Sequence, residues 1–109
     1  MGVTKSEIFT QEQNALAARF KVMAHPARLS ILQHIMHQQA CICNDLVEEL
    51  GLAQATISQH LKELKNAGII QGTIEGKSMC YCINERVWKD IQAVINQFFN
   101  QAVFIEKCC

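Results

Sequence analysis

The chain has 109 residues, enough for one compact domain, and half of them are hydrophobic, which excludes a wholly disordered protein. Ten Lys and Arg residues balance ten Asp and Glu residues, so a strongly cationic protein that coats nucleic acid is also excluded. A zero sum still leaves room for a local basic patch. We find no apolar run long enough to span a membrane and no hydrophobic secretory region in residues 1–9. We therefore expect a cytoplasmic protein with a single domain over residues 1–109.

The six cysteines come in three pairs along the chain. They are Cys41 with Cys43, Cys80 with Cys82, and Cys108 with Cys109. In a secreted chain of this size, such a number would indicate a disulfide framework. In a cytoplasmic chain with its own core, paired thiols indicate metal binding or redox chemistry instead.

The first part of the chain predicts two helices separated by a proline. Thr10 is a suitable N-cap for a helix over about residues 10–22. Pro26 suits the first turn of a second helix and disfavours a helical conformation for the residue before it. The second helix carries a broad apolar face, made of Leu29, Ile31, Leu32, Ile35 and Met36. Residues 40–43 follow as a short extended segment.

Two further helices joined by a tight turn predict a helix-turn-helix over about residues 45–67. Asn44 is a good N-cap for the first of them, which ends at Gly51. The second runs from residue 54 to residue 67 and ends at Gly68. Its apolar residues recur with helical spacing and predict its buried face, which consists of Ile57, Leu61 and Leu64.

A β-hairpin and a long helix complete the predicted fold. Two β-like runs form a wing over about residues 69–83. The helix over about residues 85–105 is apolar nearly all round, which favours packing against a second subunit. The order α-α-α-α-β-β-α is mostly helical with one hairpin and is typical of a winged helix-turn-helix.

The second helix of the motif exposes side chains of the types that contact DNA. Glutamine pairs with adenine, serine and threonine bond to bases or phosphates, and lysine neutralises phosphate. A polar helix face can also be merely solvated, but the cationic tip of the neighbouring hairpin favours DNA binding. The predicted contacts are Gln54, Thr56, Ser58, Gln59 and Lys62, with Lys77 at the hairpin tip.

Three segments of the chain resemble the ArsR/SmtB family of metal- and stress-responsive repressors. They are AHPARLSIL at residues 24–32, DLVEELGLAQATISQHLKELKNAGII at residues 45–70, and EGKSMCYCIN at residues 75–84. The resemblance covers about residues 15–90. It implies a homodimer joined through the first and last helices, bound to double-stranded DNA at an inverted-repeat operator and released by an inducer. It also implies that His60 contacts DNA together with the polar residues named above; packing or capping is the alternative for this histidine.

Cys41 and Cys43 are the first candidate ligands for an inducer. On an extended segment both thiols point the same way, so that two thiolates capture one soft ion. Arsenic-sensing members of the family carry a Cys-x-Cys in this neighbourhood. There the second cysteine directly precedes an aspartate, whereas Asn44 intervenes before Asp45 in this chain. The alternative is a pair of small buried thiols that pack as hydrophobic residues.

The other two cysteine pairs have weaker assignments. Cys108 and Cys109 supply further thiolates to the same ion, or they belong to a dispensable tail. Cys80 and Cys82 alternate along a strand with residues that suit the inner face, so we interpret them as small strand residues on the other face.

Zinc is disfavoured as the inducer. The zinc- and cobalt-sensing branch of the family places an acid and then histidines along the last helix. Glu85 fits the acid, but the other positions hold Val87, Phe98 and Gln101. Thiols without imidazoles favour trivalent arsenic or antimony, or another thiophilic ion.

These observations predict a transcriptional repressor that leaves its operator when a soft metal or metalloid, first of all trivalent arsenic, binds thiolates. The predicted ligands are Cys41, Cys43, Cys108 and Cys109. The alternative is a repressor switched by cysteine oxidation, although the family's redox branches carry a cysteine where this chain has Gln33. We expect no enzymatic activity and no cofactor required for folding.

Overall fold

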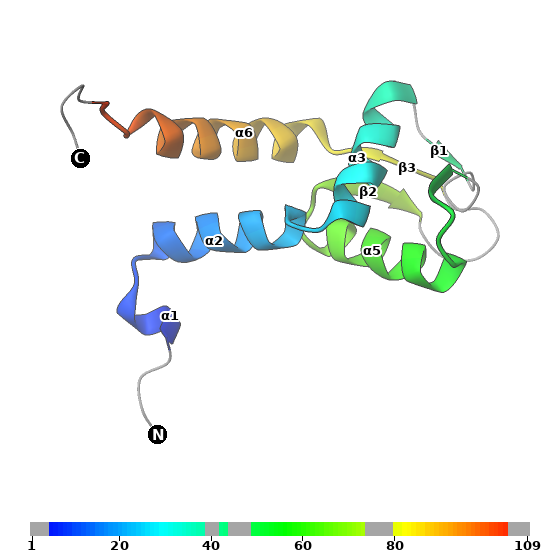
Figure 1. Ribbon diagram of the computed structural model, residues 1–109, viewed down its shortest axis with the longest axis horizontal. Helices are drawn as coiled ribbons and strands as arrows, with labels where there is room; N and C mark the ends of the chain where they lie inside the picture. Colours follow the sequence, from blue (N-terminus) through cyan, green and yellow to red (C-terminus); the bar gives the residue numbers. More distant parts are fainter. Residues whose placement is uncertain (1–4, 39–41, 44–48, 74–79, 105–109) are drawn as a thin grey trace.

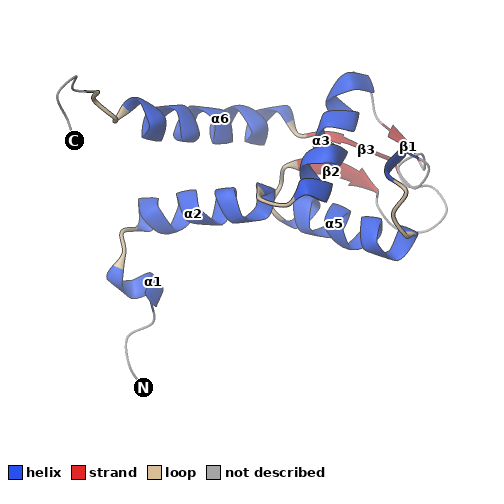
Figure 2. Cartoon of the chain, in the orientation of Figure 1, coloured by secondary structure: helices blue, strands red, loops and turns tan. Residues whose placement is uncertain are grey.

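The computed structural model describes residues 5–38, 42–43, 49–73 and 80–104, and helices dominate them (Figures 1 and 2). The elements are α1 (Lys5–Ile8), α2 (Gln11–Met23), α3 (Pro26–Gln38), β1 (Ile42–Cys43), α5 (Gln54–Asn66), β2 (Ile70–Thr73), β3 (Cys80–Ile83) and α6 (Glu85–Asn100). The mostly helical fold with a hairpin before the last helix is confirmed. Helix α1 is an addition to the prediction. The predicted first helix of the helix-turn-helix lies largely outside the described residues. Within that predicted helix, the described residues Glu49 and Leu50 are helical.

The predicted starts of the first two long helices are confirmed by their hydrogen bonds. Thr10 Oγ1 accepts from the amide of Gln13, and Gln13 Oε1 accepts from the amide of Thr10, both at 3.0 Å. This reciprocal pair is a capping box. Helix α3 begins at Pro26, where the ring of His25 accepts from the amide of Ala27 at 3.1 Å. The His-Pro dipeptide therefore ends one helix and starts the next.

The wing is a three-stranded antiparallel sheet in the order β1-β3-β2. The third strand was not predicted as part of the sheet, although it falls in the segment expected to be extended. Ile42 pairs with Tyr81 and Cys43 with Cys80 on one side of β3. On the other side Gln71 pairs with Cys82 and Gly72 with Tyr81. A Cβ atom at Gly72, whose φ is +127°, would overlap the Cys80 carbonyl oxygen, so this close approach of two strands requires glycine.

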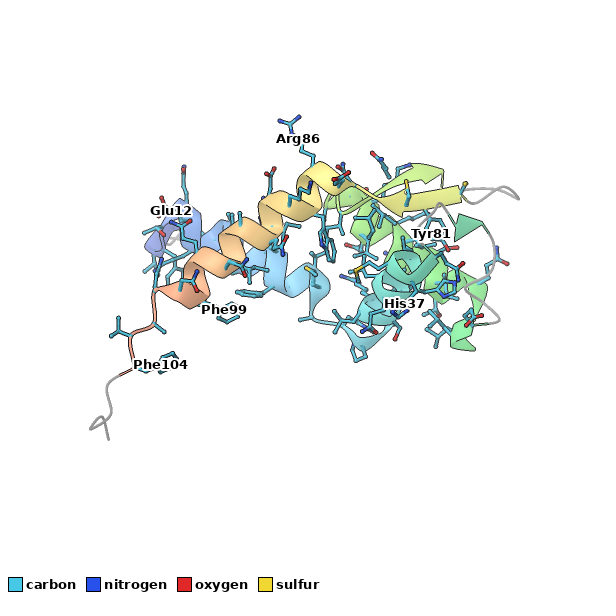
Figure 3. The ribbon with its side chains drawn as sticks, turned by 90° about the horizontal axis from the view of Figure 1, so that it is seen from above. Glu12, His37, Tyr81, Arg86, Phe99 and Phe104 are labelled. Carbon is cyan, nitrogen blue, oxygen red and sulfur yellow. The ribbon has the colours of Figure 1, made fainter. Side chains whose placement is uncertain are left out.

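The hydrophobic core lies between α3, α5 and the sheet. Three residues of α3 and the predicted face of α5 are buried there, and Tyr81 enters from β3 with no exposed surface (Figure 3). The core consists of Ile31, Leu32, Ile35, Ile57, Leu61, Leu64, Ile69, Ile70, Tyr81 and Ile91. Packing of these residues holds α5 in a fixed orientation, with its polar face outward.

Helices α2 and α6 run side by side away from this core (Figure 1). Their contact includes Phe20, whose ring lies edge-on to those of Phe98 and Phe99, with centroids 6.3 and 6.4 Å apart. Helix α6 ends at Asn100, before the predicted end near residue 105. The amides of Gln101 and Ala102 bond to carbonyls three residues back, which tightens and closes the last turn. Within the described residues, no helix has both the length and the apolar character needed to cross a membrane.

Candidate nucleic-acid interface

Helix α5 is positioned for recognition by its turn and by its buried face. Gly51 adopts a φ of +68° in the turn before the helix. Ile57, Leu61 and Leu64 have no exposed surface, as the apolar spacing predicts. Burial of these three residues fixes the rotation of the helix, so its opposite face points outward.

Most of the predicted DNA contacts lie on that outward face. Ser58 is half-buried, and four others are exposed: Gln54, Thr56, Gln59 and Lys62. Gln59 Nε2 donates to Glu63 Oε1 at 3.1 Å, which orients the amide along the helix. Because the N-cap residue is Ala53, no side chain there occupies the first amides of the helix. These amides remain available to a phosphate oxygen.

His60 differs from the other predicted contacts because it is 9% exposed. Its Nδ1 accepts a hydrogen bond from Arg28 Nε at 3.2 Å. Its ring lies 4.4 Å from the ring of His25, centroid to centroid. Arg28 is held in turn by a bond from Nη1 to the carbonyl of Val22 at 3.0 Å. This burial fits the packing alternative, and a direct contact between His60 and DNA stays a prediction.

The surroundings of His60 favour its neutral form. Burial is the largest cause that lowers the pKa of His60 below its ordinary value, and the charges of His25 and Arg28 act in the same direction. The carboxylate of Glu63 acts in the opposite direction. Arg28 is absent from the predicted site because nothing local in the sequence links residues so far apart. The contacts of His60 with His25 and Arg28 connect α5 to the start of α3.

The structure places only part of the predicted thiolate set. Cys41, Cys108 and Cys109 lie outside the described residues, as does Lys77 at the tip of the wing. Cys43 is in β1, opposite Cys80. Among the side chains that are described, no group of three or more His, Cys, Asp or Glu residues is arranged to hold a metal ion.

The thiols of β3 lie away from the core, as the strand alternation predicts. Tyr81 between them is buried, whereas Cys80 and Cys82 are half-buried. Gln71 Nε2 lies 3.9 Å from the sulfur of Cys82 and donates to it. Both cysteines are thus at the boundary between protein and solvent rather than in the core.

Glu85, the acid that fits the zinc-sensing pattern, has a different partner. Its carboxylate forms an exposed ion pair with Lys89 Nζ at 2.8 Å, one turn along α6. The hydrogen bond from Lys89 lowers the pKa of Glu85. This acid therefore contributes to the surface of the helix.

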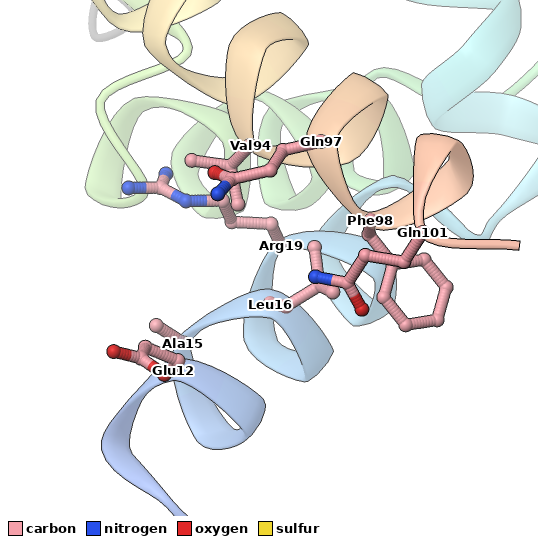
Figure 4. Close-up of a pocket in the computed structure, with 8 residues that line it drawn as sticks. All are labelled: Glu12, Ala15, Leu16, Arg19, Val94, Gln97, Phe98 and Gln101. Carbon is pink, nitrogen blue, oxygen red and sulfur yellow. The ribbon is translucent and has the colours of Figure 1, made fainter.

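The predicted dimerisation helices carry an exposed apolar surface. Phe99 is 60% exposed on α6, and Phe104 is 93% exposed beyond the end of that helix (Figure 3). A groove of about 370 Å³ lies between α2 and α6, with Gln97 and Gln101 extending toward α2 (Figure 4). Its lining consists of Glu12, Ala15, Leu16, Arg19, Val94, Gln97, Phe98 and Gln101. Exposed apolar area of this kind is typical of an interface.

Known proteins match both the sequence and the fold. Residues 25–71 match the bacterial regulatory protein, arsR family. An uncharacterized HTH-type transcriptional regulator of Methanocaldococcus jannaschii, MJ1325, is 38% identical over 77 residues, which cover 69% of this chain and 85% of that protein. The chain belongs to the arsR family. The match spans the turn into α3, α3 itself and the whole of α5, so the family assignment rests on the region that presents the polar face.

Two further relatives support this assignment. The uncharacterized HTH-type transcriptional regulator Rv0081 of Mycobacterium tuberculosis is 34% identical over 64 residues, 59% of this chain and 56% of Rv0081. The chain thus matches little more than half of that regulator. The crystal structure of Rv0081 superposes with a TM-score of 0.64 at 26% identity, covering 85% of this chain and 93% of the crystallised one. The cadmium resistance transcriptional regulatory protein CadC of Listeria innocua is 29% identical over 80 residues, 72% of this chain and 66% of CadC.

Proposed function

We propose that this chain is a homodimeric transcriptional repressor that binds an inverted-repeat operator and is released when a soft metal or metalloid binds its thiolates. The observation that carries DNA binding is the polar outward face of α5, held in place by a fully buried apolar face. Gln54, Thr56, Ser58 and Gln59 read base edges, and Lys62 and Lys77 contact phosphates. The names of the relatives, all transcriptional regulators, support the same function.

The thiol chemistry supports a soft inducer, with trivalent arsenic as our first choice. Cys41 and Cys43 supply the first thiolates, and Cys108 and Cys109 are available to complete the set. Thiolate ligands select soft ions. The relative CadC carries cadmium resistance in its name, which supports the thiophilic class of inducer without selecting arsenic.

Release follows from a difference in affinity between two dimer geometries. Two recognition helices reach successive major grooves only when their spacing matches one turn of DNA, about 34 Å. An inducer that binds more tightly to another spacing shifts the dimer toward that geometry and lowers its affinity for DNA.

Fluorescence anisotropy of labelled DNA from upstream of the gene tests this proposal. The fully reduced protein is bound to the DNA at fixed salt and titrated with arsenite. We expect release near one equivalent of arsenite per thiolate site, and loss of the response in Cys41→Ser and Cys43→Ser. Binding that arsenite leaves unchanged but that hydrogen peroxide abolishes would replace the metalloid with the redox alternative. No binding to the upstream DNA would contradict the operator assignment.

A further inference from the structure

Three cysteines occupy adjacent positions on the wing sheet. Cys43 of β1 is the register partner of Cys80 in β3, and Cys82 lies two residues further along β3. Directly opposite residues of an antiparallel pair share one face of the sheet, and so do alternate residues of one strand. The topology therefore brings Cys43, Cys80 and Cys82 to one face, although 37 positions of sequence numbering separate Cys43 from Cys80.

The backbone spacing of these positions suits a single ion. Opposite residues of an antiparallel pair have Cα atoms about 4.5–5.5 Å apart. Alternate residues of a strand lie about 7 Å apart, and diagonal neighbours about 7–8 Å. A thiolate sulfur sits about 2.3 Å from a bound ion such as zinc, so the sulfurs of one site lie within about 4.6 Å of each other. The backbone separations of the three positions are therefore compatible with ligands that share one ion.

The environment of the β3 thiols favours ligation over packing. Tyr81 fills the core from the opposite face, so the face that carries the cysteines is the outer one. Cys80 and Cys82 are half-buried there, within reach of a dissolved ion. The side-chain amide of Gln71 donates to Cys82 Sγ at 3.9 Å, so this sulfur already acts as an acceptor on the outer face.

We propose that Cys43, Cys80 and Cys82 form a three-thiolate site for a soft ion on the outer face of the wing sheet. This inference rests on the proposed function, because it takes the inducer to be thiophilic. It changes the ligand set, since the two cysteines of β3 replace Cys41 and the C-terminal pair as partners of Cys43. With arsenous acid as ligand, each thiol forms one arsenic–sulfur bond, and its proton leaves with an arsenic hydroxyl as water. Three bonds release three waters, and no atom changes its oxidation state.

The site would link two parts of the DNA-binding unit. Strand β1 precedes the helix-turn-helix in the sequence, and β3 is the returning strand of the wing. Among the described residues, Ile42 and Cys43 of β1 pair with β3. An ion held by both strands would fix β1, the strand that leads into the helix-turn-helix, against β3.

Protection from alkylation tests this site in the chain of 109 residues. Trypsin separates the cysteine pairs, because cleavage after Arg28, Lys62, Lys77 and Arg86 leaves one pair in residues 29–62 and another in residues 78–86. The reduced protein, with Cys108→Ser and Cys109→Ser, is mixed with one equivalent of arsenite or Cd²⁺. It is then treated with N-ethylmaleimide, digested and weighed by mass spectrometry. We expect both peptides to be protected together.

Single substitutions show whether the two strands share one ion. Cys80→Ser and Cys82→Ser should each abolish the protection of residues 29–62, and Cys43→Ser should abolish that of residues 78–86. Circular dichroism verifies that each variant folds, and either β3 variant suffices for the test. Protection by Cd²⁺ but not by arsenite would support the site and exclude arsenic as its ligand.

Two results would overturn the shared site. If residues 29–62 are protected alone, independently of Cys80 and Cys82, while arsenite still releases DNA, the β3 ligands are wrong and the proposed function stands. If neither peptide is protected and arsenite does not release DNA, the thiophilic inducer is wrong as well.

Discussion

At the scale of single residues, Gly72 allows two strands to approach closely, and His60 is held by contacts with Arg28 and His25. Gly72 has a φ that side-chain-bearing residues rarely adopt, and a Cβ there would lie 2.8 Å from the Cα of Tyr81. Gly51 also has a positive φ, but a Cβ there would meet open space. A substitution at Gly51 therefore measures the free-energy cost of a positive φ alone. A substitution at Gly72 measures that cost together with the cost of a steric clash.

Gly72→Ala should destabilise the fold much more than Gly51→Ala. We expect Gly51→Ala to lower the free energy of unfolding by about 1 kcal/mol, because alanine disfavours the left-handed backbone conformation at this position. We expect about 3 kcal/mol or more for Gly72→Ala, because two strands must also move apart. Urea unfolding followed by circular dichroism measures both free energies of unfolding. Equal losses in the free energy of unfolding would show that the backbones of β2 and β3 do not approach each other this closely at Gly72.

His60 should make the stability of the fold depend on pH. Its pKa is lowered in the folded chain, so the unfolded chain takes up a proton near the ordinary value of 6.5 while the folded chain does not. The contribution of neutral His60 is therefore present above that pH and is lost as the pH falls toward the lowered value. The free energy of unfolding should decrease from about pH 7 to about pH 5.

His60→Gln is the matched variant for this test, because its amide is able to accept from Arg28 and does not titrate. His25 and Glu63 remain in the variant, so the difference between the two profiles isolates the contribution of His60. We expect a flatter profile than in the unmodified chain, measured by urea unfolding at each pH. Identical profiles would assign the dependence to groups other than His60.

At the scale of elements, the sequence predicted what depends on local pattern. Thr10 and Pro26 mark helix starts through a side chain and a ring geometry that act within a few residues. The buried face of α5 follows from helical spacing. The two described residues of β1 are too few for a pattern of their own, and their pairing with β3 depends on chain segments that are remote in sequence. For the same reason, neither the Arg28–His60 bond nor the Cys43–Cys80 register could be predicted.

Helix α5 should lose DNA affinity in a way that depends on which atoms each residue reads. Gln54→Ala and Thr56→Ala should each weaken operator binding by about 5- to 150-fold, equivalent to about 1–3 kcal/mol for a base contact, and should relax sequence preference. Lys62→Ala should weaken all sequences alike and lower the salt dependence of binding. Anisotropy on operator and scrambled DNA measures both effects.

Gln92→Ala, an exposed substitution on α6, is the control for these measurements. It should leave the affinity for operator DNA unchanged. If the α5 variants bind as tightly as this control, the polar face of α5 is merely solvated.

At the scale of the whole molecule, the chain is extended rather than compact. Its radius of gyration is 17.2 Å, whereas a compact chain of about 100 residues has one of about 13 Å. The excess reflects α2 and α6, which extend from the core with apolar side chains exposed. A second copy that covers this surface is the expectation that the long apolar helix raised from sequence.

Phe99→Glu should therefore disrupt assembly. A buried charge at an apolar interface is costly, so we expect the mass in solution to fall from twice 12.3 kDa to 12.3 kDa. Size-exclusion chromatography with light scattering gives the mass. Arg86→Glu changes the charge of the same helix at an exposed side chain that points away from the body of the molecule, and it should leave the mass unchanged (Figure 3). A chain that is monomeric without any substitution would contradict the dimer.

The junction between the wing and the last helix has a mechanical consequence. A single residue, Asn84, separates β3 from α6, and it is fixed on both sides. Its amide donates to the carbonyl of Ile69 at 2.8 Å, and its side chain accepts from Val87 at 3.3 Å. These two hydrogen bonds restrict rotation at Asn84. The 16 residues of α6 form a rigid arm about 24 Å long. Tilting β3 by about 5° would swing the far end of that arm by about 2 Å, so the helix acts as a lever that magnifies small rotations of the wing.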